Sequence, residues 1–283
     1  MENNMFNRLF VLLLISVLMT GCRHDKKMSV TNKIEFDSIS VNETYHMMGK
    51  PDNPNCNLQL KFIYPVKFDN KEVLRAIQKQ FVSAHMGEMY EELSPEEAVQ
   101  KYTNIYLDDY KSLEKDFKEE TERSHSDHVT SWFSYYEIFS NEIKYNMNDL
   151  LCYSIYFENY TGGAHGAHSL VNYVLNLKTG EVMTEKDIFV EDFQDAIAQM
   201  LVDKIAGQNE VENAKELENV GFFSADEIFP NSNFLVDEEG ITYYFNEYEI
   251  AAYVVGITSV KLPYGEIRHL LRKDSPISKL ISD

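Results

Sequence analysis

Two histidines within a glycine-rich stretch are the residues of this sequence best suited to chemistry. The stretch reads Tyr160-Thr161-Gly162-Gly163-Ala164-His165-Gly166-Ala167-His168. A separation of three residues would place His165 and His168 on one face of a helix, where both could bind zinc. The glycines oppose a helix and instead allow positive φ angles and close approach to another surface. We therefore predict a turn in which His165 hydrogen-bonds the neighbouring backbone.

This turn is also the predicted ligand-binding surface. The candidate binding residues are Tyr160, Gly162, Gly163, His165, Gly166 and His168. The alternative is a metal-dependent hydrolase or deacetylase that acts on peptidoglycan, with His165 and His168 at its centre. Glu158, His125 or His128 could supply a third metal ligand, but the sequence gives no reason for any of them to lie nearby.

Other catalytic patterns are absent from the sequence. It has no Gly-x-Ser-x-Gly nucleophile motif and no phosphate-binding Gly-Lys-Ser/Thr loop. Paired carboxylates for glycoside hydrolysis carry no information in a chain with 46 acidic residues. We therefore predict no catalytic residue, no metal and no other cofactor, and we expect a binding protein rather than an enzyme.

Residues 1–21 predict a lipoprotein signal peptide. Arg8 precedes the apolar run 9–18, which is too short to span a bilayer, and Thr20 and Gly21 provide small residues before Cys22. The Thr-Gly-Cys ending resembles the lipobox of bacterial lipoproteins, in which the signal is removed and the cysteine is acylated, for example with palmitate. We expect Cys22 to carry the lipid and residues 22–31 to form a linker. Ordinary secretion is the alternative.

The formal net charge of −20 restricts the binding partners of the folded part of the chain that follows the linker. Removal of residues 1–21 deletes one glutamate and one arginine, so the mature chain keeps this charge. Such a chain repels nucleic acid and attracts basic proteins by long-range steering; the simpler interpretation is that the charge maintains solubility. The segment 23–27 is basic and does not resemble an acidic surface-export tag, so we expect an exported protein anchored in the cell envelope at the periplasmic face.

Two cysteines, Cys56 and Cys152, remain in the body after lipidation. An exported protein is permitted a disulfide, but the spacing does not show one. A disulfide and two free, partly buried thiols are both compatible with the sequence.

The hydrophobic pattern predicts an α+β fold, with antiparallel sheets, hairpins and a few packed amphipathic helices. Ser94-Pro95-Glu96-Glu97 is a strong helix start, because it combines an N-cap serine, a proline at the first helical position and a glutamate three residues after the cap. The aromatic stripe of this helix is assigned to core packing rather than to sugar stacking. Predicted strands are 34–41, 58–62, 132–136, 151–158, 173–177, 233–236, 241–245 and 260–262, and predicted helices are 73–81, 94–117, 193–205 and 266–271.

Several short blocks carry a family likeness. They are Tyr160-Thr161-Gly162-Gly163-Ala164-His165-Gly166, Leu177-Lys178-Thr179-Gly180-Glu181, Asp187-Ile188-Phe189, Phe245 with Tyr248-Glu249-Ile250-Ala251-Ala252-Tyr253-Val254-Val255-Gly256, and Val260-Lys261-Leu262-Pro263-Tyr264. In this order they resemble the extracytoplasmic domain family of the anti-sigma factor RsiV. The preceding part resembles the companion domain of the peptidoglycan deacetylase PdaC. We accordingly assign 32–168 to a PdaC-type N-terminal domain and 169–283 to an RsiV-like C-terminal domain.

The resemblance implies a binding role in the cell envelope. In the anti-sigma relative the domain binds lysozyme, and in the deacetylase relative a separate catalytic domain, which we do not expect here, performs the chemistry. The implied partners are therefore a lysozyme-like basic protein or the peptidoglycan of the cell wall. The charge of −20 fits the basic protein better, since steering acts on charge.

Overall fold

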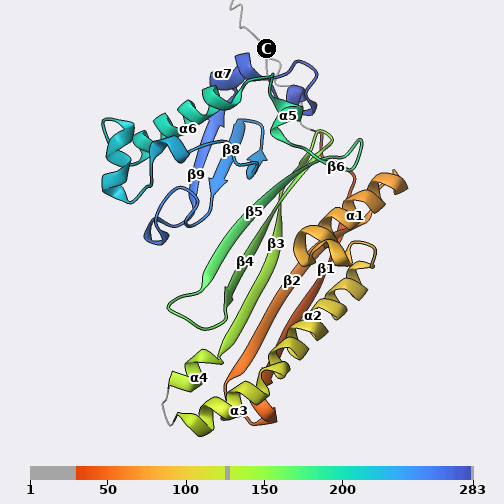
Figure 1. Cartoon of the computed structure of the whole chain (residues 1–283). Coiled ribbons are helices and arrows are strands. Elements are labelled where there is room, and N and C mark those ends of the chain that lie inside the picture. Colours follow the sequence, from red (N-terminus) through yellow and green to blue (C-terminus); the bar gives the residue numbers. More distant parts are fainter. Residues whose placement is uncertain (1–29, 125–127, 282–283) are drawn as a thin grey trace, which may run out of the picture.

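The computed structural model describes residues 30–124 and 128–281. The predicted signal peptide and Cys22 lie outside these ranges. Figure 1 shows a long twisted sheet, helices that run along its β1 and β2 side, and a smaller sheet with its own helices beyond β5. The predicted α+β class is confirmed. No helix in the described ranges is both long and apolar enough to cross a membrane.

The large sheet has six strands in the order β1-β2-β3-β4-β5-β6. The strands are β1 (Glu35–His46), β2 (Asn55–Lys67), β3 (Tyr135–Met147), β4 (Leu150–Tyr160), β5 (Ala167–Asn176) and β6 (Glu181–Val182). Four of its neighbouring pairs are antiparallel, whereas β2 and β3 are parallel. Antiparallel sheets were predicted, and the β2–β3 pair is the departure from that prediction, because the helices between these strands form the long crossover that a parallel pair requires.

Those crossover helices cover one face of the sheet. They are α1 (Lys71–Met86), α2 (Pro95–Ser112), α3 (Glu114–Arg123) and α4 (His128–Trp132). Val73, Ile77 and Phe81 of α1 are buried against alternate residues of β2 and β4. The capping box at Ser94 forms as predicted, and Tyr110 of the aromatic stripe is buried in the core.

Two element boundaries differ from the predictions in this region. The predicted helix 94–117 divides near Leu113 into α2 and α3, and Phe117 then packs with Phe133 and Tyr110. The predicted strand 132–136 was wrong in its first residues, because Trp132 ends α4 and β3 begins at Tyr135. Burial of Phe133 in the same cluster favours the helical turn over an extended chain.

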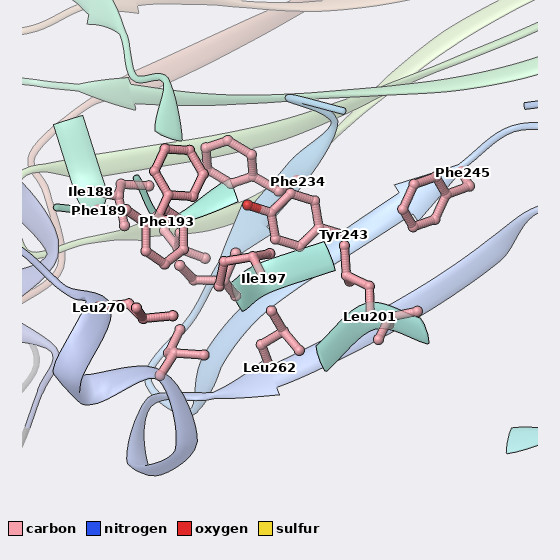
Figure 2. Close-up of a cluster of buried hydrophobic side chains, with 14 of the residues drawn as sticks. Ile188, Phe189, Phe193, Ile197, Leu201, Phe234, Tyr243, Phe245, Leu262 and Leu270 are labelled. Atoms are coloured by element: carbon pink, nitrogen blue, oxygen red, sulfur yellow. The ribbon is translucent and has the colours of Figure 1, made fainter. Parts of the chain in front are cut away.

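The smaller sheet is antiparallel, in the order β7-β8-β9. It consists of β7 (Phe234–Val236), β8 (Gly240–Phe245) and β9 (Thr258–Pro263), and its helices are α5 (Glu185–Ile188), α6 (Gln194–Gln208) and α7 (Tyr264–Ile267). The 3-10 helices of the chain are η1 (Met47–Gly49), η2 (Glu88–Tyr90), η3 (Ala214–Val220), η4 (Ala225–Glu227), η5 (Tyr253–Val255), η6 (Arg268–Leu270) and η7 (Pro276–Lys279). In Figure 2, Phe193 and Ile197 lie beside Phe234, Tyr243 and Leu262 of the small sheet.

Strand β4 joins the two halves, because it is buried on both faces. Leu151 and Tyr153 pack against the α1 side, while Leu150 and Cys152 belong to the core of the small sheet. The cores of the two halves therefore lie on opposite faces of the same strand. Cys56 lies in a third cluster, and both it and Cys152 are free and buried, so they do not form a disulfide.

Two asparagine side chains close the outer edge of β5 where β6 does not reach. The Asn233 amide donates to the Leu170 carbonyl at 2.9 Å, and its oxygen accepts from the Asn172 backbone N–H at 2.9 Å. The Asn246 oxygen accepts from the Leu170 N–H at 2.7 Å. These carboxamides replace the hydrogen bonds of a missing strand and dock the small sheet onto the large one.

Replacing Asn233 with alanine should destabilise the protein. The change leaves the buried Asn172 N–H without its acceptor, so we expect the free energy of unfolding to fall by about 2 kcal/mol. Urea denaturation measures the effect. Asn42→Ala, at an exposed position of β1, is the matched control, and equal stability of the two variants would contradict the docking role.

The buried His85 should make the fold sensitive to acid. Burial lowers its pKa to about 4, below the ordinary value of 6.5. As the pH falls from 6.5 towards 4, the unfolded chain gains a proton at this site that the folded chain does not, so the free energy of unfolding decreases by up to about 3 kcal/mol. His85→Phe should reduce this loss in pH-dependent denaturation, whereas the exposed His269→Gln should not.

Candidate functional site

The glycine-rich stretch forms the turn between β4 and β5, as predicted. Gly162 and Gly163 have φ angles of +87° and +106°, and the His165 Nδ1 lies 2.8 Å from the Gly166 carbonyl oxygen. The Tyr160 hydroxyl donates to the Gly163 carbonyl at 2.9 Å. A Cβ on Gly166 would lie 2.8 Å from the Asn159 carbonyl oxygen, so this position has no room for a side chain.

Both histidine rings stack against one tyrosine, which comes from the C-terminal half of the chain. Tyr253, in the loop between β8 and β9, lies with its ring centroid 4.4 Å from that of His165 and 6.1 Å from that of His168. Tyr248 of the same loop brings its hydroxyl to 3.5 Å from the His165 Nε2. Tyr248 has a φ of +65°, and 57% of its surface is exposed.

His168 lies between two carboxylates. Its Nε2 is 3.6 Å from a Glu158 oxygen on β4, and its Nδ1 is 3.4 Å from a Glu247 oxygen on the β8–β9 loop. The Tyr253 hydroxyl also lies 3.4 Å from Nδ1. A neutral imidazole donates one hydrogen and can serve one carboxylate, whereas the protonated ring donates to both.

Glu158 is held as a carboxylate by two tyrosines. The hydroxyls of Tyr136 and Tyr156 donate to its two oxygens at 2.8 Å each. These hydrogen bonds hold the pKa of Glu158 below its usual value, and the bond from Tyr156 has the larger effect. Burial, with a smaller contribution from Glu158, raises the pKa of Tyr156 to about 12. Glu158 is therefore suited to accept hydrogen bonds and not to act as a general acid.

We call this group of side chains the tyrosine–histidine cluster. Its members are Tyr136, Glu158, His165, His168, Glu247, Tyr248 and Tyr253. Within the described ranges no lysine or arginine forms an ion pair with Glu158 or Glu247, so the cluster presents acidic and aromatic groups together. Such a surface can bind cationic or polyhydroxylated ligands.

The metal-binding alternative depends on a third ligand. Of the three candidates, Glu158 lies beside His168, whereas His125 and the side chain of His128 fall outside the described part of the chain. Among the residues described, no group of three or more His, Cys, Asp or Glu side chains is arranged to hold a metal ion. The hydrolase alternative stays a hypothesis, and metal analysis of the purified protein would test it.

The β4–β5 turn of the site was predicted from the sequence, whereas the β8–β9 loop that faces it was not. The turn residues and Glu158 were named from their types and spacing, but Tyr136 and Glu247 were not. Glu247 lies 79 positions from His168, and their meeting depends on how the two halves dock. Tyr248 and Tyr253 were visible only as part of a block that carried the family resemblance.

Comparison with known proteins finds two families in the chain. The family described as "Deacetylase PdaC" matches residues 52–168, and the family described as "Protein of unknown function (DUF3298)" matches residues 186–265. These families fit a protein of the cell envelope. No curated protein matches the chain. The PdaC likeness is thus confirmed, whereas the likeness to RsiV stays a prediction.

Solved structures give the assignment. A DUF3298 family protein from Pseudomonas aeruginosa shares the fold, with a TM-score of 0.60 and 13% identity over 88% of this chain and 98% of its own. A member of the same family from Bacteroides fragilis has a TM-score of 0.85 and 32% identity, and the match covers 90% of this chain and 100% of that one. With this identity over nearly its whole length, the chain belongs to the DUF3298 family.

Proposed function

We propose that this protein is a lipid-anchored binding module of the cell envelope, and that its tyrosine–histidine cluster binds a basic, lysozyme-like protein. The observation that carries the proposal is the exposed Tyr248 ring, whose hydroxyl lies 3.5 Å from the His165 Nε2, in a cluster that also holds the carboxylates of Glu158 and Glu247. Tyrosine is enriched among the residues that dominate binding energy at interfaces. The net charge of −20 would steer a basic partner toward this surface.

A wall glycan is the second candidate ligand of the cluster. The rings of Tyr136 and Tyr160 stack at 6.1 Å beside the turn, and aromatic faces of this kind also pack against sugar rings. The two ligands differ in their response to salt, because screening weakens the attraction between a basic protein and acidic side chains. The periplasmic face is the proposed location.

The position of the first described residues supports display of the cluster away from the membrane. Val30 exchanges backbone and side-chain hydrogen bonds with Asn148, in the turn between β3 and β4. The cluster lies at the opposite end of β4, whose 11 residues span about 35 Å at the rise of an extended strand. A lipid on Cys22 would thus hold one end of the body near the membrane and leave the binding surface at the other.

The binding proposal is tested with hen egg-white lysozyme and the full mature chain. Calorimetric titration at low salt should show binding that weakens at high salt. Tyr248→Ala and Glu247→Gln should each weaken it by about 2 kcal/mol, whereas Glu43→Gln on the exposed part of β1 makes the same charge change and should not. Absence of binding at low salt would exclude the protein ligand, and lysozyme binding that persists unchanged at high salt would contradict the electrostatic basis of the proposal.

The anchor is tested separately in cells. An alkyne analogue of palmitate should label the protein, and Cys22→Ala should abolish the label and release the chain from the membrane fraction. Cys56→Ala is the matched control, because Cys56 is buried in the fold and should leave labelling intact. A Cys22→Ala protein that still fractionates with membranes would refute the lipid anchor.

A further inference from the structure

The face of the large sheet that points away from α1 and α2 carries an ordered row of side chains. The strand registers place Ser40 opposite Lys61, Lys61 opposite Ser140, Ser140 opposite Tyr156, and Tyr156 opposite Leu170. Residues directly opposite each other on neighbouring strands point to the same face. This row therefore crosses five strands on what we call the open face.

The open face is hollowed where β2 and β3 separate. Their parallel pairing ends at Lys61 and Ser140. Beyond that point the Asn141 side chain replaces the backbone partner of β2. It accepts a hydrogen bond from the Ile63 N–H at 2.7 Å and donates one to the Ile63 carbonyl at 2.8 Å. The hollow has a volume of about 310 Å³, and its lining includes Lys61, Ile63, Ser140 and Tyr156. Its size fits a sugar residue or a similar small group.

Lys61 is the available cation of this hollow. Its side chain is exposed and forms no ion pair with any residue in the described ranges. The other lysine of the lining, Lys144, is paired with Glu142. The net charge of −20 repels anions at long range, so binding of an anionic group in this hollow would depend on direct contact with the unpaired lysine.

The neighbours of Lys61 along the row are neutral and rich in hydrogen-bonding atoms, and the carboxylate of the lining, Glu142, is paired with Lys144. Ser40 and Ser140 flank it, and in the next row Asn42 lies opposite Gln59. Hydroxyl and carboxamide groups both donate and accept, which matches the alternating donors and acceptors of a polyhydroxylated ligand. Tyr156 adds an aromatic wall to the same hollow.

We propose that the open face binds an acidic glycan, with a sugar carboxylate held by Lys61 and sugar hydroxyls held by the flanking serine and amide side chains. An extended peptide would instead be expected to add to a free strand edge, because its main chain supplies the hydrogen bonds. A nucleic acid requires several cations, and the hollow has one that is unpaired. The inference goes beyond the proposed function, since it concerns an acidic glycan bound at a part of the surface other than the tyrosine–histidine cluster.

The test uses the mature chain and immobilised glycans that differ in charge. Polygalacturonate, alginate and hyaluronan are the carboxylated probes, and methyl-esterified polygalacturonate and pullulan are their uncharged counterparts. At least one carboxylated glycan should be retained, and its uncharged counterpart should not. Lys61→Met should weaken binding about tenfold or more, because it removes a charge-assisted hydrogen bond.

Lys71→Met is the matched control, since it removes the same charge at the exposed first residue of α1 and should leave glycan binding unchanged. Tyr248→Ala should also leave it unchanged, which separates this site from the lysozyme-binding proposal. Retention of none of the carboxylated glycans, or retention that is indifferent to esterification or to Lys61→Met, would overturn the inference. Thermal melting of each variant confirms that the fold is intact.

Discussion

The outer edge of β5 is the constraint on which the rest of the structure depends. A strand edge that is buried must have its backbone groups satisfied, and here the carboxamides of Asn233 and Asn246 do so in place of another strand. Their hydrogen bonds fix the small sheet against the large one. The same contact covers the second face of β4 and brings the β8–β9 loop over His168. The core between β4 and the small sheet and the candidate site therefore depend on the same docking contact.

The parts of the fold that were predictable are those specified by local chemistry. The capping box at Ser94 and the extended conformation of residues 151–158 each reflect neighbouring residues, and both appear as expected. The parallel pairing of β2 with β3 was missed, because strands separated by four helices leave no local trace of their partner. Trp132 was misassigned for a related reason: burial of the adjacent Phe133 is a tertiary contact, and it overrides the strand propensity of aromatic residues.

The candidate site divides in the same way. The turn around Gly162 and the backbone contact of His165 followed from the glycines, whose positive φ angles are a local property. The pairing of His168 with Glu247 did not follow, because it requires the correct docking of two halves that are joined by distant asparagines. Function is therefore harder to infer than fold in this chain, since the binding surface is assembled from both halves.

The two buried thiols have a consequence for the chemistry of the folded chain. Burial raises the pKa of Cys152 to about 12 and also raises that of Cys56, so neither is a thiolate at neutral pH. The thiolate is the reactive form in alkylation, oxidation and thiol exchange. The folded chain can thus keep two reduced cysteines under oxidising conditions without cross-linking to other proteins. Its thiols become reactive when the core opens, which makes them internal reporters of unfolding.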